Sequence, residues 1–181
     1  MKGCEMRKIT WLLAAVGAAG LVIAAAVQGA AASDGPGPAT VLKFSAMAPV
    51  TGPYVGAANA IRGVPGGGLP WELIAASGSL KRDGHLLVKV RGLVLARQAP
   101  VPPALQGSNP FTSFRALVSC QSIGAGNTAT VSNVSTGDFP ADPAGNSKID
   151  ANVSLPSPCF APIVFVTGPT GTAAWFAVTG G

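Results

Sequence analysis

The sequence predicts an all-β protein: a single antiparallel β-sandwich, Ig-like or jelly-roll-like, of about seven to nine strands. Three observations support this fold class. Several segments alternate between apolar and polar residues with the period of two that strands show. The 24 glycines and 16 prolines among 181 residues provide frequent turns. Beyond the N-terminus, the chain is rich in Ala, Val, Ser and Thr and poor in long helix formers, which favours strands over helices.

Residues 1–32 have the layout of a secretory signal peptide. Positively charged residues precede an uncharged apolar run over residues 9–27, and small residues up to Ala32 satisfy an Ala-x-Ala cleavage rule. We expect this run to form the signal helix and to be removed. It is also long enough to cross a bilayer, so a retained membrane anchor is the alternative. Cys4 precedes the run, whereas the attachment cysteine of a lipoprotein follows it, so we expect no lipid anchor.

The rest of the chain is predicted to divide into a flexible linker over residues 33–39 and the β-sandwich domain over residues 40–181. Residues 70–96 predict a central hairpin, with two long strands joined by a charged turn at residues 81–84. Gly92, in the middle of the second strand, predicts a bulge or bend. The apolar face of that strand holds Leu86, Val88, Val90 and Val94, and the mixed face holds Leu87, Lys89, Arg91, Leu93 and Leu95. We expect the apolar face to lie in the core.

Six further segments have the composition or the alternation of strands. Residues 159–167 are nearly all apolar, which predicts a central strand, and residues 128–136 are polar and β-branched, which predicts an edge strand. The six segments are residues 40–47, 111–122, 128–136, 147–155, 159–167 and 173–179.

Cys120 and Cys159 are the only cysteines beyond the N-terminal segment. Each lies on or beside a predicted strand, and an exported chain enters an oxidising compartment, so we expect them to form one structural disulfide. Two free thiols or a metal site are the alternatives. One histidine and two cysteines make a poor set of zinc ligands, so we expect no metal.

The formal net charge of +5 is mild, and part of it comes from the N-terminal segment. Beyond residue 32, the basic residues are scattered along the sequence, and the aromatic residues have the pattern of core residues. A nucleic-acid-binding protein would carry a basic stripe with stacking aromatic side chains. We therefore expect no nucleic-acid partner, and contact with a membrane only through the N-terminal segment if that segment is retained.

Two sets of side chains invite a functional interpretation. Asp83 and His85 could form an acid–base pair, but at a hairpin tip they would be solvated and would lack a positioned nucleophile. Trp71 or Trp175 could stack on a sugar if exposed, although a tryptophan in an alternating strand is more often buried. We therefore predict no catalytic residue, and we expect no cofactor.

Two loops match ligand-binding loops only in part. The glycines between residues 63 and 68 resemble a phosphate-binding loop, but Pro70 and a strand follow them where such a loop needs a helix. Asp138, Asp142 and Asn146 could offer oxygen ligands to calcium, yet they lack the alternate spacing of an EF-hand loop. We expect Asp138, Asp142 and Asn146 to be turn formers.

Five segments, taken in order, resemble a family of small secreted bacterial β-rich proteins with a cysteine pair and no assigned activity. The segments are Gly66–Trp71, Ser77–Val94, Phe114–Cys120, Leu155–Val164 and Trp175–Gly180. The resemblance covers most of residues 66–180. It implies an exported β domain with the same cysteine pair, and it adds no catalytic residues.

Together, these observations favour a secreted, extracellular or cell-envelope protein with a non-enzymatic binding or structural role and an unknown partner. An envelope hydrolase is one alternative. It would need paired acids or an activated nucleophile, and the whole chain has seven acidic residues and one histidine. A membrane-anchored accessory protein is the other alternative, if residues 9–27 are retained.

Overall fold

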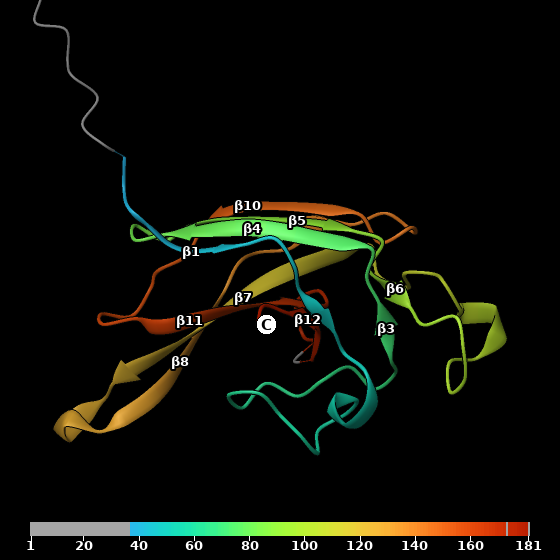
Figure 1. The fold of residues 1–181 in the computed structure, drawn as a ribbon, viewed down its shortest axis with the longest axis horizontal. Helices are drawn as coiled ribbons and strands as arrows, with labels where there is room; N and C mark the ends of the chain where they lie inside the picture. The colour runs from blue at the N-terminus through green and yellow to red at the C-terminus, as the bar shows by residue number, and fades with distance from the viewer. Residues whose placement is uncertain (1–36, 173, 181) are drawn as a thin grey trace, which may run out of the picture. The chain divides into compact units, whose positions relative to one another are not determined.

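The structure is a computed structural model that describes residues 37–172 and 174–180. The predicted signal segment, the alternative of a membrane anchor and most of the predicted linker lie outside the described residues. The described residues belong to one compact unit, Pro36–Gly181. They form an all-β fold with several antiparallel sheets, in agreement with the predicted class (Figure 1).

One sheet has four strands in the order β1-β4-β5-β10. Its strands are β1 (Thr40–Phe44), β4 (Ala75–Lys81), β5 (His85–Arg91) and β10 (Ser147–Asn152). β4 and β5 form the predicted hairpin, in which Leu80 pairs with Leu86. β10 is distant in the sequence but pairs with the free side of β5. Figure 1 shows these four strands side by side in the upper layer.

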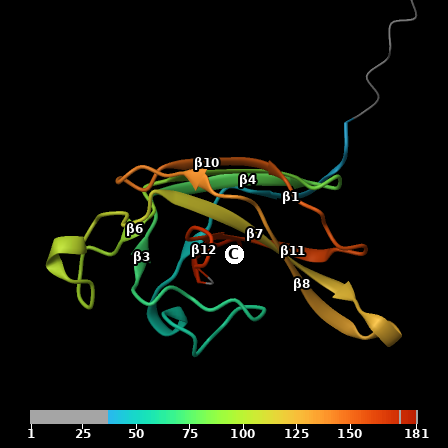
Figure 2. The same ribbon diagram turned by 180° about the vertical axis from the view of Figure 1, so that it is seen from behind.

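A second sheet has six strands, with the order β2-β12-β11-β7-β8 and β9 paired to β7. Its strands are β2 (Ala48–Pro49), β7 (Ser113–Ile123), β8 (Ala129–Ser135), β9 (Phe139–Pro140), β11 (Phe160–Thr167) and β12 (Trp175–Val178). As predicted, apolar β11 lies inside the sheet and polar β8 lies at its edge. Figure 2 shows β7, β11 and β12 below the four-stranded sheet.

The remaining elements are short. β3 (Trp71–Glu72) and β6 (Val94–Leu95) form a separate two-stranded sheet. Within the described residues, three single-turn 3-10 helices span Gly52–Tyr54, Pro103–Leu105 and Ala125–Asn127. All pairs between the named strands are antiparallel.

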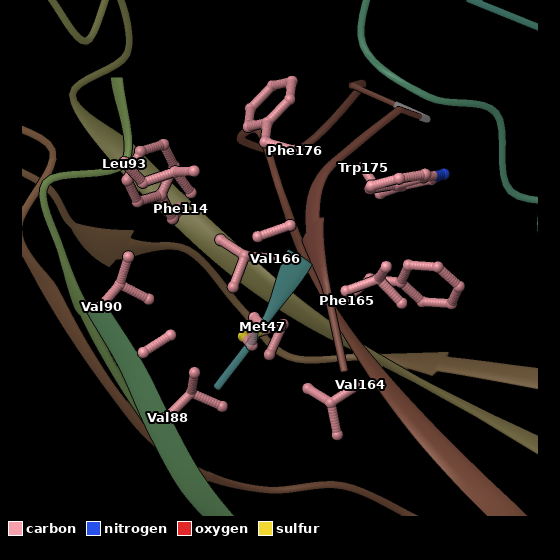
Figure 3. Packing of buried hydrophobic residues seen from close by; sticks show 14 of the residues in the cluster. Met47, Val88, Val90, Leu93, Phe114, Val164, Phe165, Val166, Trp175 and Phe176 are labelled. Atoms are coloured by element: carbon pink, nitrogen blue, oxygen red, sulfur yellow. The ribbon is translucent and has the colours of Figure 1, made fainter. Parts of the chain in front are cut away.

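The inner faces of the two large sheets contribute to one hydrophobic core. Leu86 and Val88 of β5 and Phe114 of β7 are fully buried, so the apolar alternation predicted for these strands points inward. Figure 3 shows Val88 on one side of this core, with Val164 and Val166 of β11 on the other. The outer face of each sheet is therefore the part left to contact solvent or a partner.

The outer face of the six-stranded sheet is partly covered by residues 50–67. Phe165 and Trp175 are buried, and Figure 3 shows both rings on the opposite side of the strands from Val166. The Tyr54 ring lies 6.3 Å from the Trp175 ring between centroids, and backbone hydrogen bonds join Pro65 and Gly67 to Trp175. A second apolar layer therefore stabilises this half of the sheet.

The central hairpin differs from the prediction at its ends. Residues 70–96 do not form two continuous strands, because β3 ends at Glu72 and β4 begins only at Ala75. The predicted bend at Gly92 is confirmed, with a φ of +67°. Beyond this bend, side chains of both predicted faces are buried, and Val94 is 4% exposed. Leu93 and Leu95, which we predicted on the mixed face, are 0% and 3% exposed.

We expect Gly84→Ala, in the hairpin turn, to lower the free energy of unfolding by about 2–3 kcal/mol. Gly84 has a φ of +91°, and an added Cβ would meet the carbonyl oxygen of Val153. The matched control is Gly126→Ala, where φ is +69° but an added Cβ would meet nothing within 4 Å. There we expect a loss of only about 1 kcal/mol. Urea denaturation measures both values, and equal losses would contradict the role of the Val153 contact.

Candidate functional site

The outer face of the four-stranded sheet gathers basic side chains. Side chains alternate between the two faces of a strand, so the residues between buried Leu86, Val88 and Val90 point outward. Half of the 12 Lys and Arg residues of the chain lie on this sheet or in its hairpin turn. We call this set the basic face, and its members are Lys43, Lys81, Arg82, Lys89, Arg91 and Lys148.

The centre of the basic face places two cations opposite each other. Lys89 of β5 pairs in register with Lys148 of β10, so both side chains project from the same face. Arg91 follows two positions after Lys89, about 6.6 Å further along the strand. Like charges directly opposite in a sheet are destabilising. Only one of the two cations, Lys148, has a carboxylate beside it, that of Asp150.

Most cations of the basic face have no carboxylate partner. Lys148 Nζ lies 3.0 Å from Asp150 Oδ2. Within the described residues, none of the other five cations forms a salt bridge. The only carboxylates on this sheet and in its turn are Asp83 and Asp150. The face therefore carries a net positive charge, which attracts anions from solution.

Asp150 is shared between two basic side chains. The Nε2–H of His85 donates a hydrogen bond to Asp150 Oδ1 at 2.9 Å, and Lys148 contacts the other carboxylate oxygen. These contacts lower the pKa of Asp150, and the hydrogen bond from His85 has the largest effect. Asp150 therefore stays ionised at neutral pH, where it offsets only one positive charge of the basic face.

Asp83 and His85 do not pair through their side chains. Asp83 Oδ1 instead accepts a hydrogen bond from the backbone N–H of His85 at 3.1 Å, as in an Asx-type turn. Among the described residues, no serine, threonine or cysteine hydrogen-bonds to the His85 ring. The pair that we considered for acid–base chemistry is thus part of the turn, and the partner of His85 comes from β10, which sequence reasoning did not place beside it.

Cys120 and Cys159 are joined by a disulfide, with their Cα atoms 5.0 Å apart. Cys120 is fully buried on β7, and Cys159 is half-buried immediately before β11. The bond therefore ties together two neighbouring strands of the six-stranded sheet.

The loop considered for calcium is held by its own hydrogen bonds. Asp142 accepts two hydrogen bonds from Asn146, one from the backbone N–H and one from the side-chain amide, both at 2.9 Å. These bonds lower the pKa of Asp142. Asp138 instead accepts a hydrogen bond from the backbone N–H of Thr170. In the described part of the chain, no group of three His, Cys, Asp or Glu side chains could hold a metal ion.

The two tryptophans considered for sugar stacking are core residues. Trp71 and Trp175 are each 2% exposed. Trp71 stacks on Phe176, with ring centroids 4.2 Å apart. An added Cβ at Gly67 would lie 3.2 Å from both of these side chains. Gly67 of the glycine-rich loop thus allows the loop to pack closely against Trp71 and Phe176.

The basic face was missed at the level of sequence because two of its members, Lys43 and Lys148, come from segments distant from the hairpin that holds the other four. The basic residues are scattered along the sequence, and pairing of β10 with β5 brings Lys148 beside Lys89. The positions of Lys81, Lys89 and Arg91 could have revealed the face, because the alternation of side chains places all three on the outward side of one hairpin. Alternation shows which face of a strand a residue occupies, but it does not show which strands are neighbours.

Comparisons with protein-family models, with curated proteins and with solved structures find no match to this chain. None of the helices in the described part of the chain is long and apolar enough to cross a membrane.

Proposed function

We propose that this chain is an exported, non-enzymatic binding protein whose basic face binds a polymer carrying phosphate or sulfate groups. The observation that carries the proposal is the group of five cations on one sheet and its turn that have no carboxylate partner among the described residues. Such groups keep their full attraction for an external anion, whereas a paired cation must first give up its partner.

Three observations support export to the extracellular space or the cell envelope. The disulfide between Cys120 and Cys159 is of the kind that persists in oxidising compartments. Residues 1–32 have the layout of a signal peptide. The resemblance to small secreted bacterial proteins agrees with both. We propose that the two large sheets form a β-sandwich of the Ig-like or jelly-roll-like kind, supported by their shared core.

The chemistry of the basic face favours recognition by charge. It holds no exposed aromatic residue, since the exposed aromatic side chains of the described residues are Tyr54 and Phe160. Single-stranded nucleic acids and sugar rings are usually held on such rings. Cations spaced along a strand and across strands instead match a polymer with repeated negative charges.

The test compares two charge reversals that change the net charge equally. Lys89→Glu lies on the basic face, and Arg97→Glu lies outside it, in an exposed ion pair with Glu72. Each cation near an anionic surface contributes about 1 kcal/mol. We therefore expect Lys89→Glu to weaken binding of fluorescent inorganic polyphosphate or heparin at least about tenfold, measured by anisotropy at low salt. We expect Arg97→Glu to change it less than about threefold.

The salt dependence provides a second measurement. A plot of log affinity against log salt concentration should lose about one unit of slope in Lys89→Glu. Polyphosphate and heparin distinguish a phosphate polymer from a sulfate polymer. Equal weakening by both variants would overturn the proposal, as would binding to vesicles of anionic lipid without binding to either polymer.

A further inference from the structure

A hollow of about 630 Å³ lies on the outer face of the six-stranded sheet, around Phe160. We call it the Phe160 hollow. It lies where the ends of β11, β7 and β8 are neighbours, beyond the part of this face that residues 50–67 cover. The residues that line it include Gln121, Ile123, Asn127, Val131 and Phe160.

The register of the strands gathers apolar side chains in this hollow. Gln121 of β7 pairs with Phe160 on one side and with Val131 on the other, so the three side chains form one row on the same face. Phe160, Ile123 and Val131 are 55%, 50% and 44% exposed. They are three of the seven large hydrophobic residues that are exposed in the described structure. Contiguous exposed apolar side chains on a folded protein mark an interaction site.

Phe160 is held in place from both sides. The residue before it, Cys159, is bonded to Cys120, which directly precedes Gln121. The residue after it, Ala161, has a φ of +42°, a left-handed conformation that is rare for a residue other than glycine. Such strain persists where the surrounding structure enforces it, and it concentrates at ligand sites. The backbone that carries this exposed aromatic ring is thus constrained before any ligand arrives, which lowers part of the entropic cost of binding.

The polar groups of the hollow define the chemistry of the ligand. Gln121 and Asn127 offer side-chain amide groups, and within the described residues these side chains make no hydrogen bond to the protein. None of the residues that line the hollow is charged. An aromatic face beside uncharged donors and acceptors complements a pyranose ring, which has an apolar C–H face and a rim of hydroxyl groups.

We infer that the Phe160 hollow binds a neutral sugar unit of a glycan, with the ring stacked on Phe160 and its hydroxyl groups bonded to Gln121 or Asn127. This site is separate from the basic face, because it lies on the other sheet and contains no charged side chain. Because none of its lining residues is charged, the hollow suits a neutral ligand. It does not attract the anionic polymer that we propose for the basic face. The inference therefore does not depend on the proposed function.

The test uses matched truncations at two exposed apolar residues. Phe160→Ala removes the ring, and Ile74→Ala is the control, because Ile74 is 67% exposed and lies outside the hollow. The probes are the neutral pentasaccharides of β1,4-linked N-acetylglucosamine, β1,4-linked glucose and α1,6-linked mannose, titrated by calorimetry. We expect at least one probe to bind, Phe160→Ala to weaken it about tenfold or more, and Ile74→Ala to leave it unchanged.

Two further measurements separate this inference from its alternatives. Phe160→Trp should retain or strengthen binding, because a larger aromatic face remains available for stacking. Lys89→Glu and added salt should leave sugar binding unchanged, whereas they should weaken polymer binding at the basic face. The inference is overturned if none of the three probes binds or if Phe160→Ala binds as tightly as the wild type. It is also overturned if light scattering shows a dimer that Phe160→Ala dissociates, because a second copy would then occupy the hollow.

Discussion

Removing the disulfide by the double substitution Cys120→Ala and Cys159→Ala is expected to lower the free energy of unfolding by about 4 kcal/mol. The bond joins residues separated by 39 positions, and closing a loop of that length restricts the unfolded chain. In the chain-entropy description, this restriction accounts for most of the stabilisation. Urea denaturation of the wild type and of the double variant measures the difference.

Reduced wild-type protein is the control for this experiment. It keeps both side chains at nearly their native volume and lacks only the cross-link. A similar loss in the reduced wild type and in the double variant would assign the effect to the cross-link. If the double variant loses stability but the reduced wild type does not, packing around buried Cys120 is responsible and the entropic explanation fails.

We expect Phe114→Ala to lower the free energy of unfolding by about 3–5 kcal/mol. Phe114 is fully buried on β7, and its ring lies 6.4 Å from that of Trp71 and 6.2 Å from that of Phe176, between centroids. Truncation removes an aromatic side chain from the contact between the two large sheets and leaves a cavity. The value is obtained by urea or thermal denaturation of the purified variant.

Phe160→Ala is the matched control for Phe114→Ala, because it makes the same chemical change on an exposed face. We expect it to cost less than about 1 kcal/mol, since 55% of Phe160 already contacts solvent. A loss near 3 kcal/mol at Phe160 would show that this ring serves the stability of the fold. A loss below 1 kcal/mol at Phe114 would contradict its place in the core.

Much of the fold could be predicted because alternation is a local property of the sequence. The strands that contain Phe114 and Ile149 were found in this way, and both side chains are fully buried as expected. The prediction failed where the chain bends. Gly92 was expected to bend the strand, but the burial of Leu93 and Leu95 together with Val94 depends on how far the backbone turns there and on what covers both faces.

The candidate sites were less accessible to sequence reasoning, because each depends on pairing between distant strands. The position of Lys148 opposite Lys89 follows from the choice of β10 as the neighbour of β5. The row of Phe160, Gln121 and Val131 likewise requires the order β11-β7-β8. Single phenylalanines and lysines do not indicate a site in the sequence, because most of them are ordinary core or surface residues.

The place of β12 in the six-stranded sheet has a consequence for the timing of folding. β12 is the last strand in chain order, yet it lies between β2 and β11. β2 can therefore join the sheet only after residues 175–178 have been synthesised. Folds that depend on such distant pairings form slowly. Closure of the six-stranded sheet between β2 and β11 therefore waits for the last strand of the chain.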